Sequence, residues 1–122
     1  MRYLCIYTPV AAEGAPPTPD EMARMGAFME KSIKAGVLLA AEGCMPSALG
    51  ARIRLTEGNF AVTDGPFTEA KELVGGMAII NAASKQEAIE YTKEFLNVAG
   101  DGVTEIRQLY DVSAIDTVNN AA

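Results

Sequence analysis

The chain has 122 residues, a net charge of −6 and no histidine. This length suits a single domain, and the ten scattered lysines and arginines form no basic stripe that would neutralise the phosphates of a nucleic acid. Because histidine is absent, imidazole catalysis, Ser–His nucleophiles and His-based metal sites are excluded within this chain, which leaves carboxylates, Tyr, Lys, Arg and Cys for any catalysis.

The first third of the chain predicts a strand, a capped helix and a second strand. Residues Tyr3–Tyr7 are aromatic and branched, which is typical of a strand. Thr18 and Glu21 form a capping box in front of a helix that Gly36 ends. The apolar stripe of this helix, which we expect in the core, consists of Met22, Met25, Met29 and Ile33. Residues Val37–Ala41 are apolar on both faces and predict the next strand.

The remaining two thirds predict a hairpin, a strand, a helix and a last strand. Apolar and polar residues alternate over Arg52–Thr63, and Glu57–Asn59 can form the turn of a hairpin. An apolar strand follows at Gly76–Asn81, and Ser84 caps a second amphipathic helix. The last predicted strand is Val103–Val112.

The order of these elements predicts the fold class. Strand, helix, strand, hairpin, strand, helix, strand contains the split βαβ unit of a ferredoxin-like α+β fold, here with an inserted hairpin. We expect one domain over residues 1–112 and a weakly patterned tail over residues 113–122. Two helices cover one face of such a sheet, yet Val37–Ala41 and Met77–Ile80 carry apolar side chains toward both faces. We therefore expect a homodimer in which a second copy buries the open face and forms clefts for ligands.

The sequence also predicts the cellular address. No apolar run approaches the roughly 20 residues of a membrane span, and the N-terminus does not resemble a signal peptide. We expect a cytoplasmic protein without membrane contact, in which Cys5 and Cys44 are reduced thiols. The pattern indicates no metal site and no cofactor.

The segment TDGPFTEAKELVGG, residues 63–76, carries the densest chemistry of the chain. Its DGPFTEAKE motif, followed by two glycines and an apolar strand, resembles the signature of the YCII-related proteins, specifically the DGPF branch. The agreement in element order covers about residues 2–112. The segment AGVLLAAEG at residues 35–43 and the capped TPDE helix resemble that branch as well.

The resemblance implies a ferredoxin-like subunit that pairs into a dimeric α+β barrel. Many members of the wider family carry a His–Asp pair in the cleft, but in this chain only the acid, Asp64, has a counterpart. DGPF proteins are mostly of unknown function, and some are linked with sigma-factor systems. The resemblance therefore implies less about activity than about fold.

The motif has a structural interpretation and a functional one. In the structural interpretation, Asp64 accepts backbone N–H bonds, Gly65 takes a positive φ and Pro66 fixes the corner. In the functional interpretation, Asp64 is a general acid or base in a partly apolar cleft, acting on a carbon acid or a phenol. The ligand-binding residues predicted with it are Glu42, Phe67, Lys71, Glu72, Gly75 and Gly76. Core aromatics that could also offer a hydroxyl to the cleft are Tyr3, Tyr7 and Tyr110.

Two functional classes stay open from the sequence. The first is a dimeric ligand-binding or regulatory module with a cleft near Asp64, which the missing histidine favours. The second is a cofactor-independent enzyme of the lyase or isomerase type that uses Asp64. The pattern does not indicate what residues 44–51 do.

Overall fold

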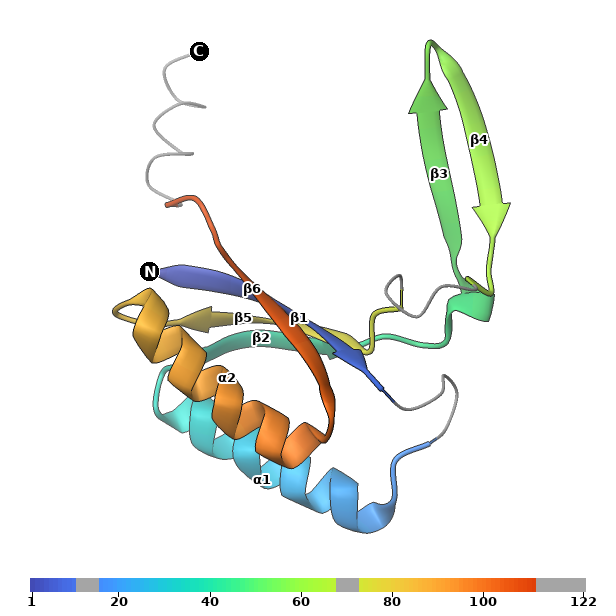
Figure 1. Ribbon diagram of the computed structural model, residues 1–122. Helices are drawn as coiled ribbons and strands as arrows, with labels where there is room; N and C mark the ends of the chain where they lie inside the picture. Colours follow the sequence, from blue (N-terminus) through green and yellow to red (C-terminus); the bar gives the residue numbers. More distant parts are fainter. Residues whose placement is uncertain (11–15, 68–72, 112–122) are drawn as a thin grey trace.

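A computed structural model of the chain describes residues 1–10, 16–67 and 73–111 (Figure 1). The elements are β1 Arg2–Pro9, α1 Pro19–Lys34, β2 Leu38–Gly43, the 3-10 helix η1 Ser47–Leu49, β3 Ala51–Thr56, β4 Asn59–Asp64, β5 Gly76–Asn81, α2 Lys85–Ala99 and β6 Gly102–Gln108. Four strands form one antiparallel sheet in the order β2-β5-β1-β6, and β3 pairs with β4 in a separate hairpin. This α+β arrangement of an antiparallel sheet and two helices is consistent with the predicted ferredoxin-like fold.

Both helices begin at the predicted caps. The Thr18 Oγ1 accepts a hydrogen bond from the Glu21 N–H at 3.1 Å, and the Ser84 Oγ accepts one from the Glu87 N–H at 3.1 Å. Gly100, with φ 101°, stands directly after α2, in a conformation that a side chain rarely adopts. Among the described residues, neither helix is long and apolar enough to cross a membrane.

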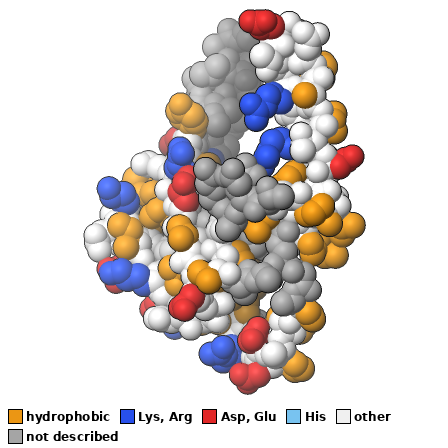
Figure 2. Space-filling model, turned by 45° about the vertical axis from the view of Figure 1, so that its right-hand side comes forward, with side chains coloured by type: hydrophobic (Ala, Val, Ile, Leu, Met, Phe, Trp, Pro, Cys, Tyr) orange, Lys and Arg blue, Asp and Glu red, His pale blue; other side chains and the backbone are white. Residues whose placement is uncertain are grey.

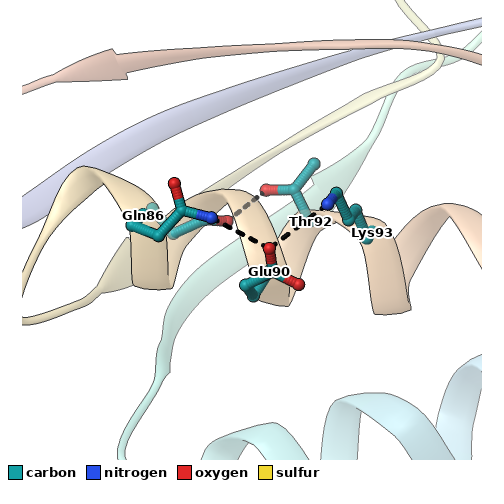
Figure 3. A network of polar contacts seen from close by, with 5 residues as sticks. Gln86, Glu90, Thr92 and Lys93 are labelled. Atoms are coloured by element: carbon teal, nitrogen blue, oxygen red, sulfur yellow. Dashed lines mark hydrogen bonds and ion pairs between the residues drawn. The ribbon is translucent and has the colours of Figure 1, made fainter.

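The outer surface of α2 carries a polar network (Figure 3). The Glu90 Oε1 accepts hydrogen bonds from the Gln86 Nε2 at 2.9 Å and from the Lys93 Nζ at 3.2 Å. Thr92, one of the buried residues of this helix, instead donates to the Ala88 carbonyl at 2.8 Å. The predicted division of α2 into a polar and an apolar side is thereby confirmed.

The core lies between the sheet and the two helices, which Figure 1 shows on the same side of the sheet. Its buried apolar residues are Tyr3, Cys5, Leu38, Ile80, Ala82 and Ala88. Next to them, the rings of Tyr7 and Phe95 meet edge to face at 5.3 Å between centroids, and those of Phe28 and Tyr91 stack at 5.3 Å. Phe28 belongs to α1, Tyr91 and Phe95 to α2, and Tyr7 to β1, so these aromatic contacts join the two helices to each other and α2 to the sheet.

The opposite face of the sheet is also apolar at its centre. The register pairs Leu4 with Ile79 and Ile6 with Met77, and alternation turns these side chains away from the helices. Met77 is 40% exposed, whereas Ile80, on the helix side of the same strand, is fully buried. The prediction that this strand is apolar on both faces is confirmed, while the homodimer derived from it stays a prediction.

The structure confirms the predicted core face of α1 in part: Met29 packs against the core and Met25 is partly buried, but the two ends of the stripe are exposed. Met22 and Ile33 are 61% and 58% exposed, and the buried residue of the helix is Ser32. Ser32 is buried without an unpaired hydroxyl, because its Oγ donates to the Phe28 carbonyl at 2.8 Å and accepts from the Tyr91 hydroxyl at 2.8 Å. A small polar residue with two partners is therefore the buried residue of α1, beside the partly buried Met29.

The last strand is shorter than predicted. It ends at Gln108 because this residue pairs with Tyr3, near the start of β1, so that little of the partner strand remains beyond it. Tyr110 is 85% exposed, so it is not a core residue, and Val112 lies outside the described residues.

Candidate functional site

Asp64 is the last residue of β4, at the base of the hairpin. Its register partner is Ala51, the first residue of β3. Because every second residue of a strand shares a face, Asp64 belongs to the same face of the hairpin as Val62 and Ile53. Asp64 is exposed, so its carboxylate can be reached from solvent.

The turn that follows Asp64 is held by η1 and by the residue after it. The Gly65 N–H donates to the Gly50 carbonyl at 3.0 Å, and the Phe67 N–H donates to the Ser47 Oγ at 3.0 Å. Pro66, between them in a cis peptide, has no N–H. The donors of the turn that the structural interpretation assigned to Asp64 are therefore used by other acceptors.

Gly65 is required for a reason that differs from the predicted one. It is not among the residues with positive φ. A methyl group at this position would instead overlap the Ser47 carbonyl and lie 3.1 Å from the Ala48 nitrogen. The glycine allows two backbone segments to touch, and this contact depends on a part of the chain whose role the sequence did not reveal.

Phe67 packs against Arg52 at the hairpin base. The guanidinium carbon of Arg52 lies 4.3 Å from the centroid of the Phe67 ring, within the range of a cation–π contact. Phe67 is half-buried by this contact. Sequence reasoning named Phe67 but missed Arg52 and Ser47. For Arg52, the only signal was a basic residue at a polar position of the hairpin.

Glu42, Gly75 and Gly76 form a second group, at the end of the four-stranded sheet. The Gly75 N–H donates to the Tyr7 carbonyl at 2.7 Å, and the Gly75 carbonyl accepts from the Cys44 N–H at 3.0 Å. A methyl group at Gly76 would lie 3.0 Å from the Glu42 carbonyl oxygen. These two glycines thus allow three strands to approach one another, and their contact with a ligand stays a prediction.

The other predicted ligand-binding side chains are those of Glu42, Lys71 and Glu72. Glu42 is exposed and pairs in register with Met77, so it lies on the open face of the sheet. Lys71 and Glu72 lie outside the described residues. The segment from Cys44 to Pro46 leads from the sheet-end group to η1 at the hairpin base, which is how the fold connects the two groups.

The tyrosines have structural roles in the described part of the chain. Tyr3 is buried in the core, and the Tyr7 hydroxyl donates to the Gly100 carbonyl at 3.2 Å. Burial, and to a lesser extent the charge of Asp101, raises the pKa of Tyr7 above its ordinary value. Tyr7 therefore stays protonated at neutral pH and serves as a donor.

Two shallow hollows of about 470 and 310 Å³ lie at the ends of the helix layer, and Asp64 lines neither. The larger is lined by Val10, Leu96, Asn97, Gly100, Asp101 and Gly102. Within the residues that the structure describes, no group of three or more His, Cys, Asp or Glu side chains could hold a metal ion. Among the described residues, Asp64 is therefore an exposed side chain at the hairpin base that lies outside both hollows.

Comparison with known proteins identifies the family. A solved structure of 5-chloro-2-hydroxyhydroquinone dehydrochlorinase (TftG) from Burkholderia phenoliruptrix AC1100, in complex with 2,5-dihydroxybenzoquinone, resembles this fold with a TM-score of 0.52 and 18% identity, over 93% of this chain and 98% of that one. The Uncharacterized protein R00369 of Rhizobium meliloti (strain 1021) is 33% identical over 89 residues, which are 72% of each protein. A family model described as the YCII-related domain matches residues 1–113. The chain belongs to the YCII-related family.

Proposed function

We propose that this protein is a small-molecule binding or regulatory module of the DGPF branch, and that its ligand contacts Asp64 at the hairpin base. The proposal rests on the hydrogen bonds that the backbone N–H groups of the turn after Asp64 make. The Gly65 and Phe67 N–H groups are bonded to Gly50 and Ser47. The carboxylate of Asp64 is therefore not needed to hold the turn, and it is exposed.

The chemistry around Asp64 favours ligands that combine an apolar ring with hydroxyl groups. An ionised carboxylate only accepts hydrogen bonds, so its partner must be a donor such as a phenol or an enol. Val62 and Ile53, on the same face of the hairpin, offer an apolar surface for a ring. The quinone in the structurally similar dehydrochlorinase belongs to this class, which makes 2,5-dihydroxybenzoquinone and simple hydroquinones suitable first probes.

The second candidate is a cofactor-independent enzyme in which Asp64 is the general acid or base. It is favoured by the place of Asp64 on the same face of the hairpin as Val62 and Ile53, because a carboxylate beside an apolar surface is in position to exchange a proton with a ring that lies on that surface. In this case, Asp64 would take a proton from a bound phenol or carbon acid and return it to the product. The two candidate functions thus use the same residue, Asp64, and differ only in whether the bound molecule is converted to a product.

The test is the variant Asp64→Asn, measured for ligand affinity by calorimetry and for stability by urea denaturation. Loss of a charged hydrogen bond, about 1.5–3 kcal/mol, should weaken binding roughly 10- to 150-fold. The unfolding free energy should change by less than about 0.5 kcal/mol, as for an exposed residue without a structural role. Glu57→Gln, an exposed acid at the other end of the same hairpin, is the matched control and should bind like the wild type.

One outcome of this test distinguishes the two candidate functions, and another would refute both. Turnover that Asp64→Asn abolishes while substrate still binds would favour the enzyme. A variant that keeps full ligand affinity but loses about 1–3 kcal/mol of stability would show that Asp64 is part of the architecture, contrary to the proposal.

A further inference from the structure

The face of the β3–β4 hairpin that lies opposite to the Asp64 face carries two arginines. Strand alternation and the register place Arg52 and Arg54 together on it. The other residues of this face are uncharged: Thr56, Asn59, Ala61 and Thr63. We call these six residues the arginine face. Figure 2 shows Lys or Arg side chains near each other where the hairpin rises in the upper part of the view.

Side chains two residues apart on a strand can meet at one point. The strand β6 shows this in the same chain, because the Arg107 Nε lies 2.8 Å from the Oε2 of Glu105, two residues earlier. Arg52 and Arg54 have the same spacing, about 7 Å along the strand, but both are cations. Like charges at this spacing repel each other, and an anion between them removes the repulsion.

Arg52 is oriented by its contacts at the hairpin base. Its guanidinium carbon lies 4.3 Å from the centroid of the Phe67 ring, and the Phe67 N–H donates to the Ser47 Oγ at 3.0 Å. A guanidinium has five N–H donors, so a contact with a ring leaves donors for further acceptors. A side chain that is already oriented loses less conformational freedom on binding. Arg52 is half-buried, whereas Arg54 is exposed and can adjust to a ligand.

We propose that the arginine face binds an oxyanion, the carboxylate or phosphate group of a small molecule. The planar fork of Arg matches both groups, because two parallel N–H groups can donate to two oxygens of the same anion. Arg52 provides the oriented fork, and Arg54 contacts the same anion from two residues further along the strand. Thr63, opposite Arg52 in the register, has a hydroxyl that can donate a third hydrogen bond.

Charge limits the class of ligand. Two arginines match one carboxylate or one phosphate group, whereas a nucleic acid needs a longer row of basic residues, which this chain lacks. A phosphate group carries a charge of about −1.5 to −2 at neutral pH, more than the single charge of a carboxylate. Inorganic phosphate and benzoate are therefore suitable probes, and they distinguish the two kinds of group. Because the net charge of the chain is −6, nonspecific attraction of anions is small.

The experiment titrates the protein with each probe at constant ionic strength and follows the NMR signals of the arginine Nε–H groups. We expect saturable shifts of the Arg52 and Arg54 signals below about 10 mM of at least one probe. Shifts with phosphate alone assign a phosphate site, and shifts with benzoate assign a carboxylate site. The wild type alone gives this result, so the test does not depend on a variant that folds. If neither probe shifts these two signals, the proposal is overturned.

Variants separate a specific site from general charge attraction. Arg54→Gln should weaken binding of the probe roughly tenfold, because a charged hydrogen bond is lost. Arg54→Lys keeps the charge but not the fork, so its affinity should lie between those of Arg54→Gln and the wild type. Lys85→Gln changes the net charge equally at an exposed position of α2 and should bind like the wild type. Equal losses in Arg54→Gln and Lys85→Gln would overturn the proposal.

The oxyanion site does not rest on the proposed function, because Asp64 belongs to the other face of the hairpin. Asp64→Asn should therefore bind phosphate or benzoate like the wild type. A protein that binds one of these anions through Arg54 but binds no quinone or hydroquinone refutes the proposed function alone. A protein that binds the quinone through Asp64 while neither anion shifts the arginine signals refutes the oxyanion site alone.

Discussion

Substitution of Gly65 by alanine tests how the DGPF turn is built. The added methyl group would overlap the Ser47 carbonyl and lie 3.1 Å from the Ala48 nitrogen. These are backbone atoms, which cannot move aside as the end of a flexible side chain can. Overpacking of this kind typically costs about 1–3 kcal/mol. We expect this cost to fall on the contact between the turn and η1.

Amide hydrogen exchange is the suitable assay, because the Gly65 N–H and the Phe67 N–H are bonded across the contact. A cost of about 1–3 kcal/mol corresponds to exchange that is roughly 5- to 150-fold faster at these two amides. The amides of α2, on the other side of the sheet, should keep their wild-type rates if only the hairpin base opens.

Gly43→Ala is the matched control. Gly43 is exposed at the end of β2, and apart from its chain neighbours no described atom lies within 4 Å of the methyl group that the substitution adds. Its exchange rates should equal those of the wild type. If Gly65→Ala leaves the two amides as protected as before, the close contact between the turn and η1 is not what selects glycine, and our account of the motif is wrong.

Three further predictions concern the helices and the core between them and the sheet. Ser84→Ala removes the N-cap of α2 and should lower the unfolding free energy by about 1 kcal/mol in urea denaturation. Tyr91→Phe removes the hydrogen bond to the buried Ser32 and should cost about 0.5–1.5 kcal/mol in the same assay. Burial raises the pKa of Cys5, of Tyr7 and of Tyr91. The folded state therefore holds these protons more tightly than the unfolded state, and this stability is complete below the unfolded pKa values. The unfolding free energy should thus be constant up to about pH 8 and fall as the pH rises through about 8.5 to 10, where the thiol and then the phenols ionise in the unfolded chain.

Two of these predictions have a further variant that checks them. Lys85→Ala, at an exposed position next to the cap, should leave the stability within about 0.5 kcal/mol. Cys5→Ala should make the loss of stability near pH 9 smaller, because one of the three protons is removed. A stability that stays constant up to pH 11 would contradict the burial of all three groups.

The elements that could be predicted from the sequence are those whose formation depends on residues adjacent in the chain. The hairpin was expected at Arg52–Thr63 and is observed at Ala51–Thr56 and Asn59–Asp64, because its turn is encoded by adjacent residues. Glu57 and Gly58, with φ 49° and 82°, supply the two positive φ values that such a turn needs. The caps at Thr18 and Ser84 were predictable for the same reason.

Features that depend on distant segments were not predictable in this way. The end of the last strand is set by the start of β1, roughly a hundred residues earlier in the chain. The burial of Ser32 depends on the Tyr91 hydroxyl of the other helix. The contact of Gly65 with Ser47 joins the motif to a segment that carries no recognisable pattern. Gly65 was therefore recognised from the sequence as a special position, but it was explained by the wrong geometry.

The most direct test of the central claim is a crystal structure of the protein soaked with 2,5-dihydroxybenzoquinone or a simple hydroquinone, viewed at the hairpin base. The account predicts ligand density within hydrogen-bond distance of the Asp64 carboxylate, while the Gly65 and Phe67 N–H groups stay bonded to Gly50 and Ser47. A structure in which the Asp64 oxygens accept the N–H groups of their own turn, with no ligand beside them at saturating concentration, would contradict it.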